Sequence, residues 1–543
     1  MAGSAPRRAL ALRAWPATLL LLAGGLHALS IGWPFTFGLA RGQTLWPVQI
    51  AAMASLAWVL LHARSARCAF AAGWWFGSCY LAATFWWLFV AMHTYGGLAA
   101  PLAFVAVFTL AGLLALYCGA VCGLWWGLNR RHAPVGALLF GTVWMMAEMA
   151  RGTWLTGFGW GSGGYAHLDG PLSFYAPWVG VYGITGLAAG LGMVIAGLLA
   201  RRAAYVGAAP EMHEDSDRPL QASKFVSFPG TWLAALVMLL PLAVPATLND
   251  FTRSNGTLAV TLLQGNIPQN EKFEAATGIV QALEWYRQEL LSARTPLVVA
   301  PETAIAVLPQ QLPEGYWEDL RAAFAPAGRT AIIGIPLGDE AQGYSNAVLG
   351  LVGGQAQPLR YDKHHLVPFG EFIPPLFRWF TQLMHIPLGD FNRGSLGQPS
   401  MPVQGQRLAP NICYEDLFGE ELAARFGDAS LAPTVFVNVS NLAWFGDSVA
   451  VDQHLAISRM RTLEFQRPFV RATNTGATAI LDHQGHTVAA LPYLRAGVLV
   501  GEVQGRVGFT PFAWWAARFG LWPLWLFALG IVAWAWWAKP RAR

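Results

Sequence analysis

Long apolar runs fill the first half of the chain, and a more even mixture of polar and apolar residues follows them. A transmembrane helix needs about 20 mainly apolar residues, and runs near that length recur here with few charges inside them. They predict eight spans, at 14–31, 44–62, 68–92, 98–128, 134–150, 172–200, 231–248 and 519–538. The longest run, 98–128, fits either one tilted helix or a broken one.

Basic residues between the runs predict the orientation, because cytoplasmic loops are rich in lysine and arginine. With eight spans and both termini in the cytoplasm, all the basic clusters fall on one side of the membrane. The clusters are Arg7, Arg8 and Arg13; Arg64 and Arg67; Arg130 and Arg131; Arg201, Arg202, Arg218 and Lys224; and Lys539, Arg541 and Arg543. We therefore expect a membrane domain at 1–248, a domain outside the cytoplasm at 249–511, and a last span with its cytoplasmic tail at 512–543.

Composition agrees with a membrane protein, since the 543 residues are 55% hydrophobic and only 12% charged, whereas soluble chains carry about 25% charged residues. The net charge of +5 comes largely from the predicted cytoplasmic loops, so it gives no reason to expect nucleic-acid binding. The first run follows three arginines, as in a signal peptide. No small-residue cleavage site comes after it, so we expect a retained helix.

Between 249 and 511 the pattern changes to short apolar strands and amphipathic helices. The early strands alternate with helices and the late ones follow one another like hairpins, which predicts an α/β domain with sheets covered by helices. The expected strands are 258–263, 296–300, 331–335, 346–351, the strand that ends at Cys413, 434–438, 469–473, 477–481, 486–490 and 498–502. The expected helices are 272–293, 314–325, 417–425 and 451–465.

Cys413 is the candidate nucleophile of this domain. The other four cysteines lie in the apolar segments, so Cys413 has no disulfide partner between 249 and 511. Exported domains usually pair their cysteines, and an unpaired thiol there suggests that it is used. It stands between an apolar strand and a predicted helix, whose N-terminus would lower its pKa. Taken alone, such a cysteine is more often a small buried hydrophobe.

Two further residues could complete the chemistry of a thiol. Glu302 follows a buried strand, and Lys363 sits in a charged turn. A thiol that attacks a carbonyl needs a base to take its proton and return it to the leaving group, which a carboxylate can do. A fixed lysine can stabilise the oxyanion, aided by a backbone N–H after the nucleophile. Taken singly, either residue could also be an ordinary surface residue.

The motifs around these residues resemble the Glu–Lys–Cys triad of the nitrilase superfamily, and more narrowly its membrane-embedded branch, the apolipoprotein N-acyltransferases. The triad motifs are Pro301-Glu302-Thr303-Ala304, the segment 361–371, and Ile412-Cys413-Tyr414-Glu415. The narrower resemblance rests on segments 438–441, 444–446, 453–455, 471–476, 156–165, 176–177 and 180–183. It covers nearly the whole chain.

This resemblance implies a nitrilase-like αββα sandwich joined to a polytopic α-helical membrane domain. It implies an enzyme that takes a fatty acyl chain from a membrane phospholipid onto Cys413 as a thioester. The acyl chain then passes to the α-amine of the S-diacylglyceryl-cysteine of an apolipoprotein. Glu302 would be the general base and acid, and Lys363 would stabilise the oxyanion. The implied protein is a monomer in the inner membrane of a bacterium, with its catalytic domain on the periplasmic side.

The same resemblance implies supporting residues. Glu371 would orient Lys363, whereas Tyr414 and Glu415 would support the nucleophile, with the Tyr414 N–H as a second oxyanion donor. The expected substrate-binding residues are Phe273, which stands where the family usually has a tryptophan, Asn438 and Trp444.

No cofactor is implied, and no metal site is expected. His364 and His365 adjoin the triad lysine, but no second cluster of ligands at suitable spacing accompanies them. The aromatic segment 374–384 could be an arm on the membrane interface or an ordinary core helix.

Three other interpretations stay open at this point. A membrane-tethered amidase would use the same triad, but it would not need eight spans. A transporter would need polar residues in several spans, and Glu148 beside Arg151 is better explained as a local ion pair. An inactive scaffold is disfavoured because the three triad residues are intact.

Overall fold

The computed structural model describes residues 5–128, 136–207, 228–274, 276–374 and 390–537. These residues divide into two compact units. The first takes the described residues up to Trp86, Phe104–Asn249, and those from Leu521 onward. The second takes Trp87–Ala103 and Asp250–Gly520, and it contains every residue predicted for the catalytic site.

The first unit is helical. Its helices are α1 (Ala5–Ile31), α2 (Trp46–Leu61), α3 (Ala66–Thr84), most of α5 (Ala100–Leu128), α6 (Gly136–Thr153), α7 (Ala176–Gly207), α8 (Phe228–Ala243) and α15 (Trp522–Trp537). Within the described residues, two helices are long and apolar enough to cross a membrane, at Ala100–Leu128 and Pro171–Ala203. The number rises to four if each of two bent helix pairs counts as one span. The eight-span count therefore stays a prediction.

The third predicted span, 68–92, is interrupted in the structure. Helix α3 ends at Thr84, and a short α4 (Leu88–Val90) and the π-helix η1 (Ala91–Tyr95) follow as separate elements. Trp87–Ala103 belong to the second unit, whereas the chain from Phe104 to Asn249 returns to the first. The apolar run is continuous in sequence, and for this reason the break could not be predicted from hydropathy.

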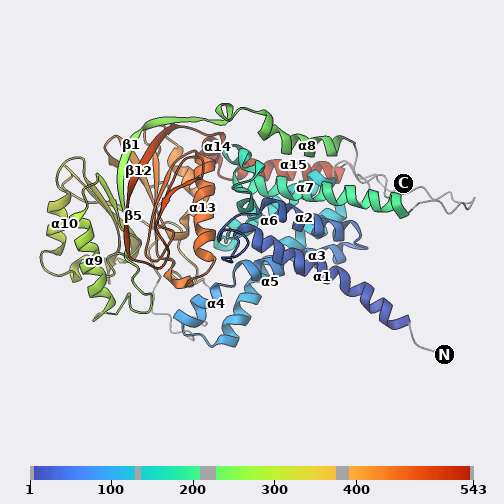
Figure 1. Ribbon diagram of the computed structural model, residues 1–543, viewed down its shortest axis with the longest axis horizontal. Coiled ribbons are helices and arrows are strands. Elements are labelled where there is room, and N and C mark those ends of the chain that lie inside the picture. Colours follow the sequence, from blue (N-terminus) through green and yellow to red (C-terminus); the bar gives the residue numbers. More distant parts are fainter. Residues whose placement is uncertain (1–4, 129–135, 208–227, 275, 375–389, 538–543) are drawn as a thin grey trace, which may run out of the picture. The chain divides into compact units, whose positions relative to one another are not determined.

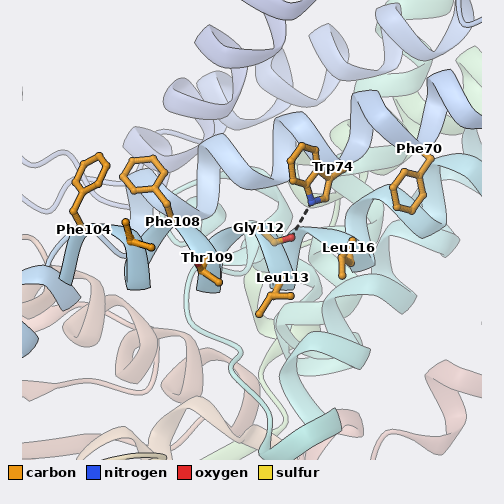
Figure 2. A pocket seen from close by; sticks show the side chains of 9 residues that line it. Phe70, Trp74, Phe104, Phe108, Thr109, Gly112, Leu113 and Leu116 are labelled. Atoms are coloured by element: carbon orange, nitrogen blue, oxygen red, sulfur yellow. Dashed lines mark hydrogen bonds between the residues drawn. The ribbon is translucent and has the colours of Figure 1, made fainter. Parts of the chain in front are cut away.

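An open apolar groove of about 530 Å³ lies on the first unit, between α3 and α5 (Figure 2). The indole N–H of Trp74 donates to the carbonyl of Gly112 at 2.9 Å and joins the two helices. The lining of the groove includes Phe104, Phe108 and Leu113, all of which are more than half exposed. None of the predicted catalytic residues lines this groove.

The second unit contains two six-stranded sheets, which confirms the predicted α/β class. One sheet has the order β12-β1-β2-β3-β4-β5 and the other the order β11-β10-β9-β8-β7-β6. The strands of the first sheet are β1 (Thr252–Gln264), β2 (Leu297–Val299), β3 (Thr330–Asp339), β4 (Gly343–Val352), β5 (Leu359–Asp362) and β12 (Gly497–Gly508). Those of the second are β6 (Met401–Val403), β7 (Gln406–Ile412), β8 (Val435–Ser440), β9 (Phe469–Thr473), β10 (Ala479–Leu481) and β11 (Thr487–Ala490).

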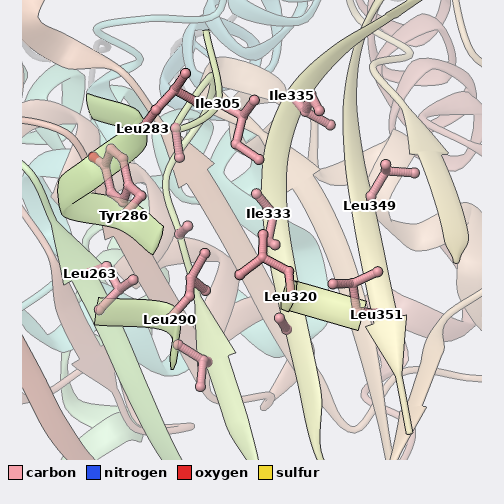
Figure 3. Close-up of a cluster of buried hydrophobic side chains, with 14 of the residues drawn as sticks. Leu263, Leu283, Tyr286, Leu290, Ile305, Leu320, Ile333, Ile335, Leu349 and Leu351 are labelled. Carbon is pink, nitrogen blue, oxygen red and sulfur yellow. The ribbon is translucent and has the colours of Figure 1, made fainter. Parts of the chain in front are cut away.

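The sheets stack face to face, and helices cover their outer faces. In β2, Leu297 and Val299 pack into the core between the sheets, whereas Val298 packs under the helices, as the two-residue period of a strand requires. Helices α9 (Gly278–Ser292) and α10 (Tyr316–Phe324) cover the first sheet (Figures 1 and 3). Helices α12 (Gly419–Ala423), α13 (Ala450–Phe465) and α14 (Pro511–Phe519) pack on the second. The layers are thus α, β, β and α.

The segment that follows α3 is anchored on this second unit. The indole of Trp87 is buried, donates to Oε1 of Gln453 in α13 at 3.1 Å, and lies edge-on to Phe445 at 4.4 Å. Tyr95 makes a similar contact with Trp444 at 6.2 Å. Both Trp444 and Phe445 belong to the short 3-10 helix η12 (Leu442–Phe445). A segment from the N-terminal third of the chain therefore forms part of the surface of the catalytic unit.

Candidate active site

Glu302 lies in the tight turn that follows β2. The next residue, Thr303, has a positive φ of 47°, which is unusual for a β-branched residue. The turn lies close against β3, since a Cβ at Gly334 would come within 2.7 Å of the Cα of Glu302. Only glycine permits this approach, so the sequence of β3 helps to fix the position of Glu302.

The carboxylate of Glu302 is buried and held on both oxygens. Its Oε2 accepts the backbone N–H of Asn441 at 2.8 Å. Its Oε1 accepts the amide of Asn346 at 2.7 Å and the ammonium of Lys363 at 3.4 Å. The carboxylate is thus oriented by three donors from three different elements.

Lys363 directly follows β5 and is only 1% exposed. Its Nζ lies 2.8 Å from Oε1 of Glu371 and 3.4 Å from Oε1 of Glu302. Burial alone would lower the pKa of Lys363, but the two carboxylates, Glu371 foremost, outweigh burial and raise that pKa well above its usual value. The side chain is therefore protonated at neutral pH, as a lysine that stabilises an oxyanion would have to be.

Glu371 is the second carboxylate that contacts Lys363 and Asn346. Its Oε1 accepts both Lys363 and Asn346, the latter at 2.7 Å, and its Oε2 accepts the backbone N–H of Val367 at 2.8 Å. The predicted contact between Glu371 and Lys363 is thus present in the structure as a buried ion pair.

Cys413 stands at the turn that follows β7, as predicted, and begins the 3-10 helix η10 (Cys413–Leu417). Its φ is 55°, a left-handed conformation that costs a non-glycine residue free energy and needs support from its surroundings. The side-chain amide of Asn438 supplies that support by donating to the carbonyl of Cys413 at 2.8 Å and to Oδ1 of Asn411 at 2.7 Å. Asn438 itself has no exposed surface, and its contacts are with the turn at Cys413, so its predicted contact with substrate stays a prediction.

The prediction that a helix N-terminus lowers the pKa of Cys413 is wrong. Burial raises the pKa of this thiol well above its usual value, Glu302 raises it further, and Lys363 offsets only part of the effect. A 3-10 helix of five residues supplies little dipole, whereas three carboxylates, those of Glu302, Glu371 and Asp416, raise the pKa of the thiol. The resting side chain of Cys413 is therefore a thiol, which would need a base to remove its proton before it could attack a carbonyl.

Glu415 joins the nucleophile turn to the loop that carries Lys363. Its Oε2 accepts the N–H of Ile412 at 2.6 Å and the hydroxyl of Tyr361 at 2.8 Å. Its Oε1 accepts the N–H groups of His364 at 2.6 Å and His365 at 3.1 Å. Four donors to one buried carboxylate thus hold the turn at Cys413 against the loop that follows β5.

Tyr414 also connects these two segments. Its hydroxyl donates to the carbonyl of Leu366 at 2.9 Å, and the Nζ of Lys363 lies 5.9 Å from the centre of its ring. The aromatic ring therefore forms one wall beside the triad lysine.

A second buried ionic group lies behind the nucleophile. Asp416 accepts the hydroxyl of Ser458 and the guanidinium of Arg471, the latter at 3.2 Å, and His454 lies 3.3 Å from its other oxygen. All four side chains have no exposed surface. Burial and the charge of Arg471 lower the pKa of His454, so this group contains one carboxylate, one guanidinium and a neutral imidazole.

Two residues near the triad were not identified from the sequence. Asn346 lies in β4 within an apolar stretch, and Lys272 follows the first strand in a polar loop. The Nζ of Lys272 is buried and donates to the backbone carbonyl of Glu302 at 3.1 Å. Burial lowers the pKa of Lys272 to about 8. The one available signal was for Asn346, since a lone amide among buried strand residues requires a polar partner.

The two other predicted substrate-binding residues, Phe273 and Trp444, both have exposed surface. Phe273 follows Lys272 and is 52% exposed. Trp444 is partly exposed beside Tyr95. Most of the predicted arm at 374–384 lies outside the described residues. Among the described residues, no group of three or more His, Cys, Asp or Glu side chains is arranged to hold a metal ion.

Comparison with known proteins gives two family matches. Residues 32–194 match the apolipoprotein N-acyltransferase N-terminal domain, and residues 259–512 match the carbon-nitrogen hydrolase family. An apolipoprotein N-acyltransferase of Verminephrobacter eiseniae is 51% identical over 94% of this chain and 94% of its own. Those of Ralstonia nicotianae and Bordetella bronchiseptica are 43% and 39% identical, each over 92% of this chain and at least 90% of their own.

Proposed function

Because this chain belongs to the apolipoprotein N-acyltransferase family, we propose that Cys413 carries the acyl chain of the reaction as a thioester. The enzyme performs the N-acylation step of lipoprotein maturation, which requires a lipid donor and a lipoprotein acceptor. The finer assignments are ours: a membrane phospholipid as donor, and the α-amine of an S-diacylglyceryl-cysteine as acceptor. The observation that carries the thioester assignment is the contact of Lys363 with both Glu302 and Glu371 in the unit that contains Cys413.

In the first half-reaction, Glu302 takes the proton of the Cys413 thiol while the sulfur attacks the ester carbonyl of the phospholipid. The oxyanion of the tetrahedral intermediate is stabilised by Lys363 and by the N–H of Tyr414. As the intermediate collapses, the ester C–O bond breaks and Glu302 returns the proton to the leaving oxygen. The products are a lysophospholipid and acyl-Cys413. The raised pKa of the thiol supports this sequence, because a resting thiol needs a base.

In the second half-reaction, the neutral α-amine of the acceptor attacks the thioester carbonyl. Glu302 takes a proton from the attacking nitrogen, the C–S bond breaks, and the sulfur of Cys413 recovers a proton. An N-terminal amine with a pKa of about 8 is a better nucleophile at neutral pH than a lysine side chain with a pKa of about 10.4. The exposed ring of Phe273 and the partly exposed Trp444 offer apolar surface for the acyl chains.

The test is intact-mass analysis of the full-length protein in nanodiscs that contain phospholipid. We expect a fatty acyl adduct on Cys413 that is discharged by a peptide with an N-terminal diacylglyceryl-cysteine. The same peptide without the diacylglyceryl group should discharge it much more slowly. Equal discharge by both peptides, or rapid hydrolysis with neither present, would instead identify a membrane-tethered amidase.

We also propose the eight-span topology, with the catalytic domain on the periplasmic side of the inner membrane and both termini in the cytoplasm. It is supported by the basic clusters of the sequence and by the apolar helices of the first unit. Single cysteines placed within 252–508 should react with a membrane-impermeant reagent added outside, and cysteines beside Arg130 should not. Labelling beside Arg130 from outside would contradict this topology.

A further inference from the structure

Asn346 is the residue that touches both carboxylates of the site. Its side chain is 5% exposed, and its Nδ2 donates to Oε1 of Glu302 and to Oε1 of Glu371, at 2.7 Å in each case. An amide group has two N–H bonds, and here each is directed to a different carboxylate. The same two oxygens accept Lys363. Each of these two carboxylate oxygens thus accepts one charged donor, Lys363, and one neutral donor, Asn346.

The backbone of Asn346 adds a second link. Its carbonyl accepts the N–H of Lys363 at 2.9 Å, where β4 pairs with β5. The side chain therefore orients the base while the main chain orients the oxyanion residue. Asn346 therefore has hydrogen bonds to Glu302, Lys363 and Glu371 together.

The orientation of this amide follows from its partners. With nitrogen and oxygen exchanged, a carbonyl oxygen would face two carboxylate oxygens, which is repulsive. In the orientation present, Oδ1 is buried and has no hydrogen-bond partner among the described residues. The two hydrogen bonds from Nδ2 of Asn346 to Glu302 and Glu371 thus offset the cost of leaving its Oδ1 without a partner.

Two neighbouring carboxylates tend to share one proton, because their negative charges repel. A shared proton would leave Glu302 unable to accept the proton of the thiol. A fixed neutral donor to both carboxylates opposes this, since it favours the charged form of each without itself losing a proton. Charged and titratable groups that face Glu302 from other elements are Lys363, Glu371, Lys272 and Cys413.

We propose that Asn346 is a positioning residue that keeps Glu302 unprotonated and aligned for the acylation of Cys413. This inference rests on the proposed function, because it assigns Glu302 as the base. It predicts a specific defect: when the amide is removed, acylation should fail first at acid pH, where Glu302 then binds a proton. A residue with a merely structural role would lower the rate equally at every pH.

The experiment compares wild type with Asn346→Asp, Asn346→Ala and the matched control Ser345→Ala, which changes the preceding buried residue of β4. Single-turnover formation of acyl-Cys413 is followed by intact mass in phospholipid nanodiscs from about pH 5 to about pH 9. In Asn346→Asp the acid limb should move up by about one pH unit or more, which is about a tenfold slower reaction on that limb. Asn346→Ala should shift in the same direction by less, and Ser345→Ala should coincide with wild type.

An acid limb at its wild-type position in both Asn346 variants would overturn the proposal, whether or not the rate is reduced. If Asn346→Asp fails to fold, the position of the limb in Asn346→Ala decides. Failure of the proposed function looks different, because wild type itself would then form no acyl-Cys413.

Discussion

Replacing Lys363 by methionine removes the cation that lies between the two buried carboxylates while preserving most of the side-chain volume. Lys363 is 1% exposed and contacts Glu371 at 2.8 Å and Glu302 at 3.4 Å. Without it, two carboxylates remain buried with the neutral amide of Asn346 between them. The substitution therefore tests stability and catalysis at once.

The two effects have different magnitudes. Removing one partner of a buried ion pair costs about 3–5 kcal/mol of folding free energy. At roughly 2–4 °C for each kcal/mol in a unit of this size, the midpoint of thermal unfolding should fall by roughly 6–20 °C. Losing one oxyanion donor slows a reaction by about 10²–10³. Proton sharing between the carboxylates would add to this loss, so we expect acylation to fall by at least about 10³.

The assay is single-turnover formation of acyl-Cys413 in nanodiscs, at a temperature below the unfolding midpoint of the variant. Lys272→Met is the matched control, because it removes another buried lysine whose hydrogen bond goes to a backbone carbonyl, not to a carboxylate. Its acylation rate should fall by much less than that of Lys363→Met. Acylation by Lys363→Met within about tenfold of wild type would refute the assigned role, since this loss is far below the one expected.

Three further outcomes are expected. Cys413→Ser should stay folded but form no acyl adduct, because a serine hydroxyl is a far weaker nucleophile without a base matched to it; wild-type turnover would contradict covalent catalysis. Asp416→Asn should lower the unfolding free energy by about 3–5 kcal/mol, because it leaves the guanidinium of Arg471 buried without its anion, and an unchanged melting temperature would contradict this. The free energy of unfolding of wild type, minus that of Lys272→Met, should rise by about 3 kcal/mol between about pH 8 and pH 10.5, since the unfolded chain still binds a proton on Lys272 when the folded chain has lost it. Thermal unfolding of both proteins across this range measures this difference, and a constant difference would contradict the assignment.

Strands with clear apolar periodicity were predicted closely from the sequence. The strand expected at 469–473 is β9 (Phe469–Thr473), and the helix expected at 451–465 is α13 (Ala450–Phe465). Two short edge strands were missed, β5 and β6. Two of the four residues of β5 are Arg360 and Asp362, and the three residues of β6 include Pro402. Such strands are defined by their neighbours in the sheet and not by their own pattern.

The candidate site could be predicted where it depends on short motifs, but not where it depends on tertiary contacts. Glu302, Lys363 and Cys413 were identified because each stands in a motif at the end of a strand. Asn346 was not, because its importance arises only when β4 brings it between two carboxylates from distant segments. The pKa of Cys413 was predicted in the wrong direction for the same reason, since burial and neighbouring charges depend on the fold.

A thiol that resists ionisation before substrate arrives is also a thiol that resists damage. Oxidants, and partners in disulfide exchange, react with thiolates far faster than with thiols. In the oxidising compartment where we place the catalytic domain, a permanently activated Cys413 would be consumed between turnovers. Burial, together with the carboxylates around it, keeps the thiol protonated. In the proposed mechanism, Glu302 removes that proton only when a carbonyl is in position to receive the sulfur. The arrangement that makes a base necessary thereby also lengthens the working life of an unpaired cysteine.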